Sequence, residues 1–271
     1  MAGSGTWVWA ALMPHPPIIV PGVGGGREKD AAVTLAGVAE LMKRLNALGA
    51  PDRILLLSPH QAYVPGAFAI NGAPLIQGGL SLFGAPDASF ELRTPVEGVN
   101  ALAAHLAAKN VPVALTGSAS LVHDQGSTVP LYFLEKSYGK LPEVVLSSPI
   151  GLGKTLSLEL GRALASFGDG RRWGLLASGD LSHRLKPGAP AGFSPAGAVF
   201  DKTVVECLER ADASALLAMP DETIEDAGEC GMRSVIAMIG LVSELGGRID
   251  VLSYEGPYGV GYCNAAAVLG P

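Results

Sequence analysis

Short apolar runs alternate with amphipathic segments along this 271-residue chain, and this alternation limits its fold more than any other feature. Short apolar runs are typical of buried strands, whereas apolar residues spaced by three and four are typical of helices that cover a sheet. The order predicts a single α/β domain over residues 1–271, with a mostly parallel central sheet and helices on both faces. The predicted strands are residues 7–12, 54–57, 68–70, 80–83, 111–115, 144–147, 173–177, 251–254 and 262–268, and the predicted helices are residues 27–48, 96–109, 155–167, 195–210 and 230–245.

Composition argues against several classes of protein. The formal net charge of -6 gives no basic surface of the kind that binds nucleic acid. No uninterrupted apolar run approaches the ~20 residues that span a bilayer, and the first apolar stretch lacks the preceding basic region of a signal peptide. The three cysteines, Cys207, Cys230 and Cys263, are widely spaced, which argues against a disulfide framework. We therefore expect a cytoplasmic protein that binds neither nucleic acid nor a membrane.

Three histidines follow predicted strands closely. His15 lies between prolines after the first strand, His60 follows strand 54–57, and His183 follows strand 173–177. A neutral imidazole is the commonest metal ligand and the usual general base near neutral pH. Because ligands gather beyond the carboxyl ends of strands in such sheets, we expect His15, His60 and His183 to meet in one site. His123, in a loop between a strand and a helix, is a further candidate.

Glu229 and Cys230 are candidate anionic partners of these histidines. Gly228 and Gly231 flank the pair at the start of a predicted helix, which indicates a backbone brought close to another group. The structural alternatives are an acid stabilised at a helix N-terminus and a small buried apolar residue. Two histidines and one carboxylate form the facial triad of non-haem Fe(II) oxygenases, so we expect Glu229 rather than Cys230 as the third ligand. A cysteine ligand would instead favour Cu(I) or Zn.

One segment imitates a phosphate-binding loop. The residues Gly151-Leu152-Gly153-Lys154-Thr155 resemble the end of such a loop. Ser148, however, occupies the position where the loop requires its first glycine. We therefore do not expect nucleotide binding there.

With these residues, the sequence resembles the class III extradiol dioxygenases, the LigB-like superfamily, over essentially its whole length. The strongest likeness is to the LigB-like domain of AmmeMemoRadiSam system proteins, to which the Memo proteins are related. The motifs that carry the resemblance are Pro14-His15-Pro16-Pro17, Ser58-Pro59-His60, Gly126-Ser127-Thr128-Val129-Pro130-Leu131-Tyr132-Phe133, Ser178-Gly179-Asp180-Leu181-Ser182-His183-Arg184-Leu185, Gly228-Glu229-Cys230-Gly231-Met232-Arg233-Ser234 and Ser253-Tyr254-Glu255-Gly256-Pro257-Tyr258-Gly259-Val260-Gly261-Tyr262.

The resemblance implies roles for individual residues. His15 and His60 match the two metal histidines of the extradiol enzymes, and His183 matches their acid/base histidine. The third ligand would be Glu229 or Cys230, the latter by likeness to the Memo proteins. In this chain Gln125 occupies the position of the family's second active-site histidine, for which His123 would be a partial substitute.

The function that the resemblance implies is a non-haem Fe(II)-dependent, extradiol-type ring-cleavage dioxygenase. Its partners would be O₂ and a small catecholic or related aromatic substrate, and the alternative metals are Zn, Cu and Mn. The alternative is a Memo-like metal-binding redox or interaction protein without ring cleavage, which Gln125 and Cys230 favour; metal-assisted hydrolysis uses similar ligands. An AMMECR-type domain would be a separate partner chain, and the oligomeric state, homo-oligomer included, stays open.

Overall fold

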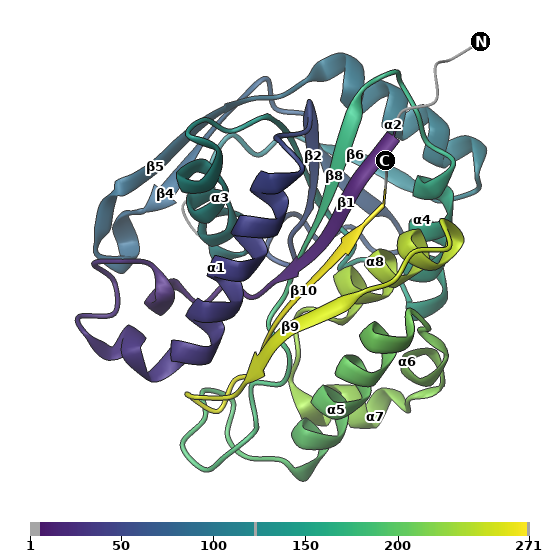
Figure 1. The fold of residues 1–271 in the computed structure, drawn as a ribbon. Coiled ribbons are helices and arrows are strands. Elements are labelled where there is room, and N and C mark those ends of the chain that lie inside the picture. Colours follow the sequence, from purple (N-terminus) through teal and green to yellow (C-terminus); the bar gives the residue numbers. More distant parts are fainter. Residues whose placement is uncertain (1–5, 122–123, 270–271) are drawn as a thin grey trace.

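Eight strands form the central sheet of the protein, and a two-stranded ribbon lies beside it (Figure 1). The computed structural model describes residues 6–121 and 124–269. The strands of the sheet are β1 (Thr6–Met13), β2 (Arg53–Leu57), β3 (Phe68–Asn71), β6 (Val113–Thr116), β7 (Glu143–Ser148), β8 (Arg172–Ser178), β9 (Asp250–Glu255) and β10 (Tyr262–Val268), and those of the ribbon are β4 (Leu75–Leu80) and β5 (Ala85–Arg93). The sheet order is β6-β3-β7-β2-β8-β1-β10-β9.

The centre of this sheet is parallel. Strands β7, β2, β8 and β1 are neighbours that run in the same direction, and β3 and β6 form a further parallel pair. The pairs β3–β7, β1–β10 and β10–β9 are antiparallel. The chain therefore forms a single α/β domain with a mixed, mostly parallel sheet, as predicted. Because the four central strands are parallel, their carboxyl ends lie at one edge.

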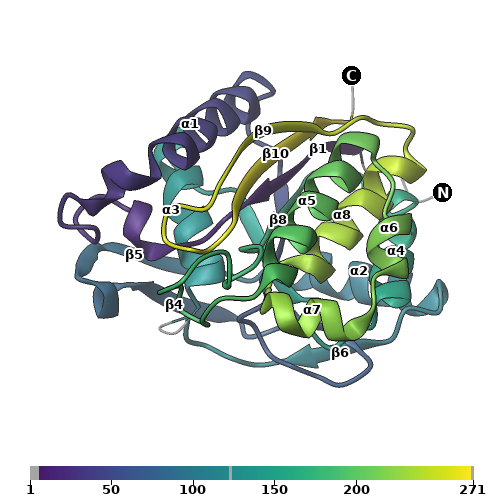
Figure 2. The ribbon, with the colours of Figure 1, turned by 90° about the horizontal axis from the view of Figure 1, so that it is seen from below.

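Helices cover both faces of the sheet, in agreement with the prediction (Figures 1 and 2). One face packs against α2, α4, α5 and α8, and the other against α1, α3 and the ribbon. No helix in the described part of the chain is both long and apolar enough to cross a membrane. The helices are α1 (Ala32–Ala47), α2 (Val96–Ala108), α3 (Gln125–Tyr138), α4 (Lys154–Ala165), α5 (Pro195–Arg210), α6 (Ser214–Ala218), α7 (Asp221–Ala227) and α8 (Met232–Glu244).

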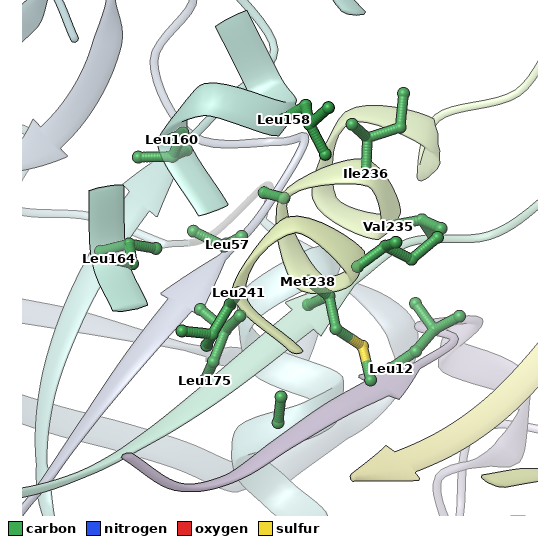
Figure 3. Packing of buried hydrophobic residues seen from close by; sticks show 14 of the residues in the cluster. Leu12, Leu57, Leu158, Leu160, Leu164, Leu175, Val235, Ile236, Met238 and Leu241 are labelled. Atoms are coloured by element: carbon green, nitrogen blue, oxygen red, sulfur yellow. The ribbon is translucent and has the colours of Figure 1, made fainter. Parts of the chain in front are cut away.

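The continuous apolar strands follow from this burial on two faces. In β2, Leu55 and Leu57 pack into the core under α8, whereas Ile54 and Leu56 pack under α1. Successive side chains of a strand point to opposite faces, so a strand covered on both faces needs apolar residues at every position. Figure 3 shows Leu57 within the first of these cores, beside the side chains of α4 and α8.

Glycines allow α4 and α8 to approach closely. A Cβ atom on Gly161 of α4 would lie 2.1 Å from the Ala237 carbonyl oxygen of α8, which is far inside van der Waals contact. A Cβ atom on Gly240 of α8 would lie 2.6 Å from the Leu158 carbonyl oxygen of α4. The close approach fixes α8 against α4, and α8 begins two residues after Cys230.

Several segments differ from the expectation. The strand β5 and the short helices α6 and α7 had no predicted range, and Arg27–Ala31, the start of predicted helix 27–48, forms a 3-10 turn before α1. Residues 80–83 were predicted as a strand. Leu80 is the last residue of β4, and Ser81–Phe83 form a 3-10 turn, because the ribbon turns back there into β5. Helix 230–245 was predicted to include Cys230, but α8 begins at Met232, whose backbone N–H donates 2.6 Å to the Glu229 carboxylate. The sequence pattern also gave no range for α3, which contains Pro130.

The segment that imitates a phosphate-binding loop has a structural explanation. A Cβ atom on Gly151 would lie 1.9 Å from the Val64 carbonyl oxygen, so this glycine permits backbone packing. The Lys154 ammonium group donates 2.7 Å to the Met219 carbonyl oxygen and 2.7 Å to the Asp221 carboxylate. The lysine thus joins α4 to the segment that begins α7.

Candidate metal site

The loops that follow β1, β2 and β8 bring the predicted histidines to the carboxyl edge of the sheet. His15 lies two residues beyond β1, and His60 lies three residues beyond β2. The backbone N–H of His15 donates 2.8 Å to the Asp180 carboxylate in the loop after β8. Since β2, β8 and β1 are adjacent, side chains distant in sequence meet at this edge.

Three side chains converge there: His15, His60 and Cys230. The two histidine Nε2 atoms are 3.1 Å apart, and the Cys230 Sγ atom lies 3.6 Å from the Nε2 atom of His15. The imidazole rings meet edge to face, with centroids 4.9 Å apart. One donor atom from each residue lies within 4.8 Å of the other two, a spacing that could hold one metal ion. His15 is buried, whereas part of His60 is exposed to solvent.

A pair of glycines brings Cys230 to the histidines. A Cβ atom on Gly179 would lie 2.3 Å from the Gly231 Cα atom, so neither position could carry a side chain without moving the backbone. The Gly231 N–H donates 3.0 Å to the Asp180 carbonyl oxygen, which ties the start of α8 to the loop after β8. Cys230 directly precedes this contact and therefore faces His15.

Glu229 lies outside this cluster. Its side chain is 3% exposed, and one carboxylate oxygen accepts the Met232 N–H at the start of α8. The other oxygen lies 3.5 Å from the Arg233 guanidinium, and burial raises the pKa of Glu229. The structure therefore brings Cys230, the alternative third ligand, next to His15 and His60. Glu229 instead accepts a backbone hydrogen bond at the N-terminus of α8.

Burial shifts the site toward its uncharged forms. Burial, reinforced by His60, lowers the pKa of His15 to about 3, and burial also lowers the pKa of His60. Burial raises the pKa of the Asp180 carboxyl to about 6 and that of the Cys230 thiol well above its ordinary value. Both imidazoles are therefore neutral near pH 7, which is the form that binds metals.

Hydrogen bonds to neighbouring side chains orient the two imidazoles. Ser178 Oγ lies 2.9 Å from His15 Nδ1 and can accept a hydrogen bond from a proton on Nδ1, which leaves the Nε2 lone pair directed at His60 and Cys230. The buried carboxylate of Asp124 accepts 2.8 Å from the Ser58 hydroxyl, two residues before His60. The side-chain amide of Gln125 lies 3.4 Å from His60 Nε2. This glutamine therefore stands beside a candidate metal ligand.

His183 is held in the same region by its backbone and its ring. Its Nδ1 atom lies 2.7 Å from the Gly228 carbonyl oxygen. A carbonyl oxygen only accepts, so Nδ1 carries the proton and Nε2 has a free lone pair. An electrostatic interaction with the protonated form of His183 would lower the pKa values of His15 and His60, which puts its ring within electrostatic reach of both. His123, the other histidine predicted for the site, lies outside the described residues.

A buried carboxylate that the sequence pattern did not single out supports the His183 loop. Asp201 of α5 accepts 2.8 Å from the Ser182 N–H and 2.8 Å from the Tyr254 hydroxyl. A Cβ atom on Gly261 would lie 1.9 Å from its Oδ2 atom, so the glycine makes room for it. Asp124 was also not predicted as part of the site. Its side chain accepts the Ser127 N–H as the N-cap of α3, a role that is common for an acid directly before a helix.

Comparisons with known proteins agree with this architecture. Residues 9–264 match the protein family described as the catalytic LigB subunit of aromatic ring-opening dioxygenase. The chain is 32% identical over 262 residues to Protein CA_C1420 of Clostridium acetobutylicum, covering 93% of this chain and 55% of that relative, so it spans about half the relative's length. The solved structure of the uncharacterized protein JW3007 from Escherichia coli K12 superimposes with a TM-score of 0.65 at 16% identity, covering 96% of this chain and 99% of that one.

Proposed function

Because this chain belongs to the family of the catalytic LigB subunit of aromatic ring-opening dioxygenases, we propose that it is a metal-dependent, extradiol-type dioxygenase. Its substrates would be O₂ and a small catecholic or related aromatic compound. The observation that carries the proposal is the convergence of His15, His60 and Cys230 at the carboxyl edge of the sheet. The sequence alone predicted two of these residues, His15 and His60, as metal ligands.

The three donors fit a metal ion. The two Nε2 atoms face each other at 3.1 Å with both imidazoles favoured in the neutral form, and the thiol lies beside them. A bound ion would orient the aromatic diol and lower the pKa of its hydroxyl group. Fe(II) is the metal expected for the family's chemistry, whereas a thiolate among the ligands favours Zn or Cu; Mn is the fourth metal to test.

His183 would act as the acid and base of the reaction. Its Nδ1 proton is engaged by the Gly228 carbonyl oxygen, so Nε2 can accept a proton from a substrate hydroxyl. The same atom can return that proton to the product. The ring is fixed for this purpose because Asp201 holds the preceding residue, Ser182.

A second candidate function is that of a Memo-like metal-binding redox or interaction protein without ring cleavage. Two observations favour it: Cys230 rather than Glu229 stands beside the histidines, and Gln125 stands beside His60. A glutamine side chain can hydrogen-bond but cannot transfer a proton near neutral pH. An AMMECR-type domain stays a proposed partner under either function.

The deciding experiment is metal analysis of anaerobically purified protein, followed by oxygen uptake with a panel of catechols for each metal. Ring opening requires consumption of O₂ together with loss of the catechol absorbance. We expect His60→Ala to lose metal and activity together, and His183→Ala to keep its metal while losing activity. Stoichiometric metal without oxygen uptake on any diol would favour the second function. Equal loss of metal in both variants would contradict the assigned roles.

A further inference from the structure

A buried carboxylate of α5 joins the loop of His183 to the edge strand β9. Asp201 is 0% exposed, and each of its carboxylate oxygens has a donor of its own. Oδ1 accepts 2.8 Å from the Ser182 N–H, and Oδ2 accepts 2.8 Å from the Tyr254 hydroxyl. No arginine or lysine of residues 6–121 or 124–269 forms an ion pair with it. Because burial opposes the charge of a carboxylate, these two hydrogen bonds are what stabilise it.

The edge strand β9 contacts a different helix on each of its faces, because successive side chains of a strand point to opposite faces. Glu255 accepts the Thr34 N–H at the start of α1 on one face. Tyr254 points to the other face and reaches Asp201 of α5. Figure 2 shows α1 and α5 on either side of β9. Tyr254 is 39% exposed, so this tyrosine reaches from the molecular surface to a buried carboxylate.

Ser182 extends this contact to the end of α7. Its hydroxyl donates 2.7 Å to the Ala227 carbonyl oxygen and accepts 3.0 Å from the Arg184 N–H. A Cβ atom on Gly197 of α5 would lie 2.4 Å from the same hydroxyl, so the helix packs directly on this serine. Asp201 and Ser182 therefore join three segments: α5, the loop after β8 and the end of α7.

His183 lies within this junction. Its backbone N–H lies 3.3 Å from the carbonyl oxygens of both Ala227 and Gly228, and its Nδ1 atom lies 2.7 Å from the Gly228 carbonyl oxygen. The Gly228 carbonyl oxygen only accepts, so it favours the tautomer with the proton on Nδ1. This preference requires the His183 loop to stay against the end of α7, and the hydrogen bonds of Ser182 hold it there.

We propose that Tyr254, acting through Asp201, is a positioning residue for His183 and keeps its ring in the Nδ1–H tautomer with Nε2 free. The proposal rests on the proposed function, in which Nε2 of His183 accepts the substrate proton. Without the Tyr254 hydroxyl, Oδ2 of Asp201 would be buried without its donor, and the carboxylate would hold the Ser182 N–H less firmly. The His183 loop would then separate from Gly228 more often, and the ring would lose its preferred tautomer.

The test is NMR on the metal-free full chain at pH 8, with Tyr254→Phe, which removes the hydroxyl and keeps the ring. We expect the backbone amides of Ser182 and His183 to exchange hydrogen about tenfold faster, since a hydrogen bond to a charged group contributes at least about that factor. The ring nitrogen shifts of His183 should show the Nδ1–H tautomer alone in the wild type and a mixture of both tautomers in the variant. His183→Ala identifies the signals of this ring.

The matched control is Tyr138→Phe, because it also removes the hydroxyl of a partly buried tyrosine, one that donates 3.4 Å to the Leu45 carbonyl oxygen of α1. It should leave both signals of His183 unchanged. A single tautomer in Tyr254→Phe would overturn the proposal, and so would an equal rise in exchange at all protected amides, which indicates a general loss of stability. Because neither measurement needs metal or turnover, a protein without dioxygenase activity can pass this test, and an active dioxygenase can fail it.

Discussion

The amino and carboxyl edges of the central sheet differ in the buried groups that they carry and in whether those groups are charged. At the amino edge, Arg53 opens β2, and its guanidinium donates 2.6 Å to Glu143 and 2.5 Å to Asp169. Asp169 also accepts 2.9 Å from the Trp173 indole. At the carboxyl edge of the same strands, His15 and Cys230 meet with no arginine or lysine among their hydrogen-bond partners in the described chain.

The directions of the pKa shifts express this difference. Burial alone would lower the pKa of Arg53, but hydrogen bonds and charges from Glu143 and Asp169 raise it. At the carboxyl edge, burial dominates, so the pKa of His15 falls and that of Cys230 rises. One edge therefore carries opposite charges that stabilise each other, and the other carries neutral donors able to receive a cation. We therefore expect the amino edge to contribute to stability and the carboxyl edge to bind the ligand.

The largest effect should come from the amino edge. Arg53→Met removes the cation but keeps much of the apolar stem, and it leaves the largely buried Asp169 carboxylate without its partner. Breaking a buried pair costs about 3–5 kcal/mol, and the exposure of Glu143 puts this case at about 3 kcal/mol. Urea unfolding should show this loss, while the metal affinity of the folded protein stays unchanged. Arg210→Met, at an exposed ion pair, is the control. A parallel loss of metal affinity would contradict the division between the edges.

Asp201 tests whether a buried acid near the binding edge reduces stability. Burial raises its pKa from 3.8 to about 6, so the folded state binds more protons than the unfolded state between those values. Asp201 therefore lowers stability as the pH rises through 6, by up to about 3 kcal/mol. Asp201→Asn keeps an acceptor for the Ser182 N–H. We expect its free energy of unfolding, relative to the wild type, to be higher at pH 8 than at pH 4. An unchanged difference across this range would refute the assignment.

Cys230 and Glu229 give the sharpest test at the carboxyl edge itself. Cys230→Ser replaces a soft donor beside His15 and should weaken Zn²⁺ binding on the order of 100-fold, about 2.7 kcal/mol. Glu229→Gln should leave the affinity within a few-fold, because the side chain caps α8 rather than facing the histidines. Competition with a chelator measures both affinities. The opposite result would return the site to the His₂–carboxylate set first predicted from the sequence.

The difference between the two edges also explains which parts of the fold and of the site could be predicted from the sequence alone. Burial on both faces leaves continuous apolar runs such as Ile54 to Leu57, so the strands and the meeting of His15 with His60 could be predicted from the pattern. The choice between Glu229 and Cys230 could not, because it depends on the backbone contact between Gly179 and Gly231, which are far apart in the chain. The pattern places the loops at one edge; tertiary packing decides which side chain of a loop faces inward.

The smallest effect, taken for each pH unit, is the pH dependence of metal binding, and it tests the neutral state of the carboxyl edge directly. Burial, with smaller contributions from Asp180 and Glu229, keeps the Cys230 thiol protonated well above pH 9, whereas His15 and His60 are neutral above pH 7. A metal that binds all three residues must therefore release one proton, from the thiol. The affinity for Zn²⁺ should rise about tenfold for each pH unit between 7 and 9, which corresponds to about 1.4 kcal/mol per unit. In Cys230→Ser this slope should disappear, because no other ligand titrates in that range. A wild-type affinity that is flat from pH 7 to 9 would mean that the thiol stays protonated in the complex, and Cys230 would then be a neighbour of the metal rather than its ligand.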